Sequence, residues 1–133
     1  MKPDPDYLKS LLSAFRDAPG PTTDIQELQR SGLDYEDPRF EFHLKLLADD
    51  GYVESDSGRG GIGLDKGADG TCMWSVIPLR LTATGHEFAE ALSNDKALET
   101  VKKSFWGASL STIKEVAVAV VKAEISRHTG LQL

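Results

Sequence analysis

The chain has 133 residues, 40% of them hydrophobic and 27% charged, with a formal net charge of −6. This length allows one domain with a sizeable core. Its single cysteine, Cys72, excludes an intrachain disulfide and a thiolate metal cluster, and we expect a reduced thiol in or under a strand. We see neither a signal peptide nor an apolar run approaching the ~20 residues of a membrane span, so we expect a cytoplasmic protein.

The charge is unevenly divided along the chain. Residues 1–93 carry nine Lys and Arg against seventeen Asp and Glu, whereas residues 94–133 carry six against four. The net charges of the two segments are therefore −8 and +2. Because DNA binding draws much of its affinity from neutralising phosphates, the acidic segment counts against a high-affinity DNA-binding protein.

The first third of the chain predicts three helices. Asp6 is a suitable N-cap for the first, in which apolar residues recur three and four positions apart: Leu8, Leu11, Leu12, Phe15. Thr23 and Gln26 form a capping-box pattern that opens a short second helix. Asp37 is the expected N-cap of the third, and Pro38 suits its first position. The inner stripe of that third helix is Phe40, Leu44 and Leu47.

The middle of the chain predicts two strands joined by a long loop. Residues 52–54 form a short strand, and residues 55–70 contain six glycines without periodicity, which indicates a mobile loop. Residues 71–79 have the β-branched and aromatic content of the second strand. A helix opened by Thr84 and Glu87 in a capping-box pattern follows.

The last forty residues predict a helical extension. A short helix capped by Asp95 precedes a final helix from Ser109 to about His128. Apolar residues cover an arc of roughly 200° on that final helix, about twice the stripe of a one-sided helix. Within this arc, Val116, Val120 and Val121 are candidates for protein contact. The second side is covered by the domain itself, a second copy of the chain or another protein, and we favour a homodimer.

Three patterns that imitate chemical sites are incomplete. Gly58 to Gly63 spell GxGxxG, but the following LDKGADG cannot start the helix that a phosphate site requires. Residues 65–76 lack two ligands of a calcium loop. His86 and Glu90 lie one helical turn apart without a third ligand at suitable spacing. We therefore expect no catalytic, cofactor or metal site, and we expect His43 to be a partly buried packing residue.

Two resemblances rest on separated blocks of sequence. HLKLLADDGYVE, a glycine-rich segment and then LRLTATGHEF resemble the winged-helix repressors of the multiple-antibiotic-resistance type. MKPDPDYLKSLL, FHLKLLADDGYVE, LRLTATGHEFAEAL and GASLSTIKEVA resemble the bacterial and phage family called domain of unknown function 2513. The resemblance implies a winged-helix-like fold and no established activity.

The fold expected is therefore α+β and mostly helical. It comprises a winged helix-turn-helix with a two-strand wing at residues 1–93 and a helical extension at residues 94–133. On the outer face of the third helix, Phe42 and Leu46 are candidates for protein contact, or they pack under the wing or the C-terminal helices. The candidates for DNA contact are Arg39, Lys45, Arg59 and Lys66.

These features predict a non-enzymatic interaction or regulatory module that acts through protein contacts, including self-association. The alternative is a dimeric transcriptional regulator that binds DNA with the third helix and the wing. A recognition helix usually presents Arg, Lys, Asn, Gln, Ser or Thr to the groove, whereas Glu41 and the apolar pair stand here beside two cations. We therefore rank protein contact first.

Overall fold

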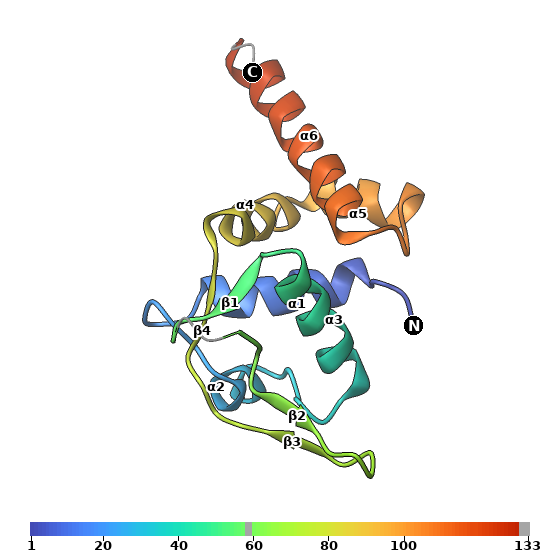
Figure 1. Ribbon diagram of the computed structural model, residues 1–133. Coiled ribbons are helices and arrows are strands. Elements are labelled where there is room, and N and C mark those ends of the chain that lie inside the picture. Colours follow the sequence, from blue (N-terminus) through green and yellow to red (C-terminus); the bar gives the residue numbers. More distant parts are fainter. Residues whose placement is uncertain (58–59, 131–133) are drawn as a thin grey trace.

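The computed structural model describes residues 1–57 and 60–130. Within that part the chain is α+β and mostly helical, as predicted (Figure 1). The helices are α1 (Pro5–Arg16), α2 (Ile25–Arg30), α3 (Pro38–Asp49), α4 (Ala83–Leu92), α5 (Asp95–Ser104) and α6 (Leu110–Thr129). The strands are β1 (Val53–Ser55), β2 (Leu64–Lys66), β3 (Cys72–Trp74) and β4 (Leu79–Leu81).

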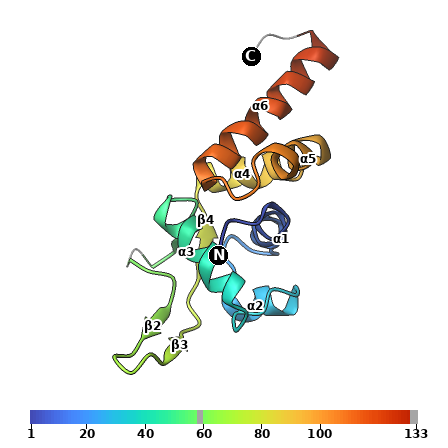
Figure 2. The same cartoon turned by 90° about the vertical axis from the view of Figure 1, so that its right-hand side faces the viewer.

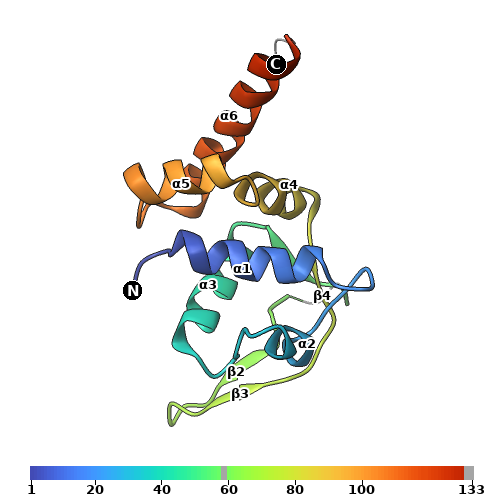
Figure 3. The same ribbon diagram turned by 180° about the vertical axis from the view of Figure 1, so that it is seen from behind.

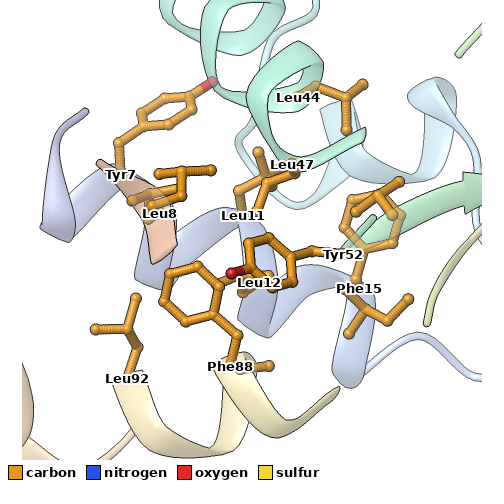
Figure 4. Close-up of a cluster of buried hydrophobic side chains, with 14 of the residues drawn as sticks. Tyr7, Leu8, Leu11, Leu12, Phe15, Leu44, Leu47, Tyr52, Phe88 and Leu92 are labelled. Carbon is orange, nitrogen blue, oxygen red and sulfur yellow. The ribbon is translucent and has the colours of Figure 1, made fainter. Parts of the chain in front are cut away.

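Helix α1 is the centre of the hydrophobic core. It lies between α3 on one side and α4 on the other, and Figure 4 shows their side chains meeting around it. The predicted stripe of α1 is buried, because Leu8, Leu11 and Leu12 expose none of their surface. The side chains that close over it include Leu44 and Leu47 of α3 and Phe88 and Leu92 of α4.

Four helices begin at other caps than the sequence pattern predicts. Asp4, not Asp6, caps α1, and its carboxylate accepts hydrogen bonds from the N–H groups of Asp6 and Tyr7. The cap of α2 is Asp24 and not Thr23, that of α4 is Thr82 and not Thr84, and that of α5 is Asn94 and not Asp95. A cap residue needs an extended backbone and a side-chain oxygen near the third N–H of the helix. Where two suitable residues lie one or two positions apart, the path of the preceding chain decides between them.

The strands form two separate antiparallel pairs. Strand β1 pairs with β4 through Val53 and Leu81, and Thr23 adds an isolated bridge to Leu79 on the other edge of β4. Strand β2 pairs with β3, with Leu64 opposite Trp74. Strands β2 and β3 therefore form a hairpin that is inserted in the chain between the paired strands β1 and β4.

The strand pairing corrects three expectations. Residues 71–79 were predicted to form one strand, but β3 ends at Trp74 and β4 begins at Leu79. Residues 55–70 were predicted to form a loop, but β2 lies within this segment, so the region between β1 and β4 holds a strand pair of its own. Cys72 was predicted to be buried, but it is exposed on β3. Flanking glycines and the polar residues Asp65 and Lys66 give β2 a weak strand signal, and its pairing with β3 is a contact that local propensity does not reveal.

Gly85 allows α4 to start close to β1. A Cβ atom at this position would lie 2.0 Å from the carbonyl oxygen of Tyr52. The same carbonyl accepts a hydrogen bond from the N–H of Thr82, 3.0 Å away. The glycine is therefore required by a close approach of two backbones.

The C-terminal helices share the core with the rest of the chain. Helix α5 packs on α1, and α6 packs on α4 and α5 (Figure 2). The hydrophobic cluster continues from α1 into Ala97 and Val101 of α5 and into Leu110, Ile113 and Ala117 of α6. Among the described residues no helix is long and apolar enough to cross a membrane.

Candidate interaction surfaces

The inner stripe of α3 is buried and its outer face is mixed in character. Phe40, Leu44 and Leu47 expose none of their surface, as the predicted stripe requires. Phe42 and Leu46, the candidates for protein contact, are both half-buried. The Phe42 ring lies edge-on to the His43 ring at 5.1 Å, whereas Leu46 packs against the core cluster. Each of the two is thus covered in part by its own domain.

His43 is fully buried, which goes beyond the predicted partial burial. Its Nδ1 lies 2.7 Å from the Arg39 carbonyl oxygen, and its Nε2 accepts a hydrogen bond from the backbone N–H of Asp4 at 2.9 Å. A carbonyl can only accept and an N–H can only donate, so the ring carries one proton, on Nδ1. Burial lowers the pKa of this imidazole and keeps it neutral.

Arg39 forms an ion pair at the start of α3 and a cation–π contact with α1. Its guanidinium Nη2 lies 2.7 Å from Oδ2 of Asp37, the residue that caps α3, and it also lies over the Tyr7 ring. Hydrogen bonds from Arg39 lower the pKa of the Asp37 carboxyl. The positive charge of Arg39 is therefore offset by a carboxylate of the chain itself.

Lys66 is engaged as well. Its ammonium lies 3.1 Å from a carboxylate oxygen of Glu41, so an ion pair joins β2 to the outer face of α3. This hydrogen-bonded pairing raises the pKa of Lys66. Lys45 is exposed on α3, and the remaining cation candidate, Arg59, lies outside the described residues.

The beginning of α3 borders a groove that the sequence patterns did not indicate. The groove has a volume of about 530 Å³ and lies between α3 and β3, lined by Tyr35, Glu36, Asp37, Pro38, Glu41, Cys72, Met73 and Trp74. Trp74 lies edge-on to both Tyr35 and Phe40, whereas Met73 is 71% exposed. Successive residues of a strand point to opposite faces, so two adjacent large apolar residues, Met73 and Trp74, indicate that one of them faces outward. This was the sequence signal that could have revealed the groove.

Helix α6 is buried along only its first part. Leu110, Ile113 and Ala117 are buried, but none of the described side chains from Val118 to His128 is. The candidates Val116, Val120 and Val121 pack partly against the core cluster. The rest of the helix extends away from the body toward the C-terminus (Figures 1 and 3).

In the described part of the chain, no three His, Cys, Asp or Glu side chains are grouped so that they could hold a metal ion. Searches of protein-family models, of curated proteins and of solved structures found no match to this chain. The winged-helix interpretation and the family resemblance therefore stay predictions.

Proposed function

We propose that this chain is a non-enzymatic winged-helix interaction module that acts through protein contacts, including association with a second copy of itself. One observation carries the proposal. Side-chain burial on α6 ends at Ala117, although the helix continues with Val118, Val120, Val121 and Ile125. A helix whose apolar side chains are covered only in part by its own domain is suited to contact another molecule.

The outer face of α3 supports protein contact. Two of the cation candidates, Arg39 and Lys66, are paired with carboxylates, and the segment before the helix adds the exposed side chains of Asp34 and Glu36. Half-buried aromatic residues lie beside them. A mixed apolar and acidic face is more typical of protein interfaces than of surfaces that follow a phosphate backbone.

The test is the mass of the protein in solution. Analytical ultracentrifugation at tens of micromolar should show a dimer. Ala119 is exposed on α6, so Ala119→Arg should leave the circular dichroism spectrum unchanged and yield monomers. The matched control is Ala68→Arg, at an exposed position between β2 and β3 and distant from α6 (Figure 1), which should stay dimeric. A monodisperse monomer for the unaltered chain contradicts self-association.

A second candidate function is a dimeric DNA-binding regulator, and one observation favours it. The Lys66–Glu41 ion pair holds the β2–β3 hairpin against α3, so a helix and a wing border one surface. Lys45 on that surface is exposed. Against this function, acidic side chains precede α3, and the N-terminal residues of a recognition helix are those that contact bases.

Fluorescence anisotropy with random duplex DNA at low salt separates the two functions. A DNA-binding regulator should bind at micromolar protein, should lose affinity steeply as salt rises, and should bind more weakly after Lys45→Glu. The interaction module should give no change in anisotropy under these conditions. Asp50→Asn, near the other end of α3, is a control whose anisotropy should match that of the unaltered chain.

A further inference from the structure

Two opposite charges on the outer face of α6 lack ion-pair partners in the described chain. Glu115 and Lys122 are both exposed, and neither forms an ion pair with a described residue. Positions three and four residues away from each hold only Ser, Thr, Val, Ala or Ile, so no i to i+4 pair is available within the helix. Seven residues separate the two charges, about 10 Å along the axis, which is too far for a direct pair.

Small apolar side chains lie between these two charges. A shallow groove of about 240 Å³ runs here, lined by Glu87, Lys114, Glu115, Val118, Ala119 and Lys122. The Lys114 ammonium lies over the Tyr52 ring, and its Nζ lies 3.7 Å from a carboxylate oxygen of Glu87. Lys114 therefore forms its ion pair on the α4 side of the groove. Ala119 is exposed in the middle of this face, and Val118 beside it is half-buried and packs in part against the core cluster. Their size lets a second helix approach closely.

The symmetry of a homodimer then decides the direction of pairing. In a twofold contact each residue meets its counterpart in a reciprocal way. A parallel pair of α6 helices would place Glu115 beside Glu115 and Lys122 beside Lys122, which is repulsive. An antiparallel pair centred between Val118 and Ala119 places each Glu115 beside Lys122 of the second copy. The antiparallel arrangement thus forms two Glu115–Lys122 ion pairs, one at each end of the contact.

We infer that two copies of this chain associate through an antiparallel pair of α6 helices, centred at Val118 and Ala119 and closed by two reciprocal Glu115–Lys122 ion pairs. This inference rests on the proposed self-association and names its partner surface. The second copy is the occupant because its charges complement the face at the required spacing. Glu115, Ala119 and Lys122 are exposed on this face, and Glu87 of α4 lines only one side of its groove.

Charge reversal tests the inference. Glu115→Lys and Lys122→Glu should each weaken the dimer about tenfold in sedimentation equilibrium at low salt, because each creates two like-charge contacts. The double variant should restore the dissociation constant to within about threefold of the original value. All three proteins should keep the same melting temperature as monomers, since both side chains are exposed. Double-variant binding that is as weak as the sum of the two losses would overturn the pairing.

Cross-linking tests the direction. In a Cys72→Ser background, which removes the exposed native thiol, Ala119→Cys should form a disulfide-linked dimer on mild oxidation. Ser126→Cys should not, because the antiparallel pair places its two copies on opposite sides of the centre, about 20 Å apart along the axis. Efficient cross-linking at both positions would indicate parallel helices and overturn the inference.

The outcomes also separate this inference from the function on which it rests. A dimer that is indifferent to both charge reversals and to Ala119→Arg means that self-association uses another surface. A chain that stays monomeric at tens of micromolar means that self-association itself fails. In the first case the proposed function as an interaction module is retained, and the inferred pairing of α6 helices is rejected.

Discussion

The backbone N–H of Asp4 donates a hydrogen bond to Nε2 of His43, 2.9 Å away, and thereby joins the start of α1 to the middle of α3. The other ring nitrogen is bonded to the Arg39 carbonyl oxygen. The Tyr7 ring lies 4.7 Å from the imidazole. A second proton on His43 would remove the acceptor for Asp4 and place a charge in the core.

This relationship predicts a pH dependence of stability. The pKa of His43 is lowered from 6.5 in the folded chain by burial, so the unfolded chain binds the proton more readily. The contribution of His43 is therefore fully present above pH 6.5 and is lost as pH falls from there toward the folded pKa. Burial and the positive charge of Arg39 lower the pKa of His43, whereas the hydrogen bond to the Arg39 carbonyl and the charges of Asp4 and Asp37 raise it and moderate the shift. Urea unfolding at a series of pH values measures the loss.

Two variants identify the group responsible. His43→Gln should flatten the dependence of the unfolding free energy between pH 7 and 5, at a lower overall stability. His86→Gln, at an exposed position on α4, should keep the slope of the unaltered chain. An unchanged slope in His43→Gln would mean that other groups cause the pH dependence.

Gly85→Ala should destabilise the fold. The new methyl group would lie 2.0 Å from the Tyr52 carbonyl oxygen, which belongs to the backbone and cannot rotate away, so α4 or the chain entering β1 must shift. Overpacking of this kind costs about 1–3 kcal/mol. Gly60→Ala is the matched control, since its Cβ would have no heavy atom within 4 Å and it should change the unfolding free energy little. Equal denaturation midpoints for the two variants would contradict the close approach.

Phe88→Ala should be among the most damaging single changes. The ring is fully buried on α4 and lies 5.0 Å from the Tyr52 ring. Loss of a buried phenylalanine side chain costs about 3–5 kcal/mol, which is a large part of the stability of a small domain. Chemical denaturation checks this value against Met73→Ala, whose side chain is 71% exposed. A loss below about 1 kcal/mol for Phe88→Ala would show that the core repacks around the cavity.

The two ends of α3 should respond oppositely to removal of a carboxylate. Asp37 accepts a hydrogen bond from the Arg39 N–H at the start of the helix, so Asp37→Ala should cost about 1 kcal/mol. Asp49 lies in the last turn, where a negative charge opposes the helix dipole, and Asp49→Ala should be neutral or stabilising. Thermal unfolding of both variants at pH 7 measures the difference. A stabilising Asp37→Ala would exclude the capping role.

Much of the helical fold was predictable because it rests on local chemistry. The apolar spacing around Leu11, the Asp37–Pro38 start of α3 and the Ser109 cap of α6 are short-range patterns, and each produced the expected helix. Hairpin β2–β3 was not predictable from its residues. Its pairing depends on partners across a glycine-rich turn and on the link from Lys66 to Glu41.

The candidate surfaces were likewise predictable only in those features that depend on neighbouring residues. Helical periodicity alone indicates that α6 is apolar over too wide an arc for one contact, and the residue types alone identify Arg39, Lys45 and Lys66 as the cations near α3. The fold, in contrast, determines that complete burial on α6 stops at Ala117 and that two of those cations are paired with carboxylates. The physical reason is that helical periodicity is a property of neighbouring residues. Coverage and charge pairing depend instead on which distant segments the fold brings together.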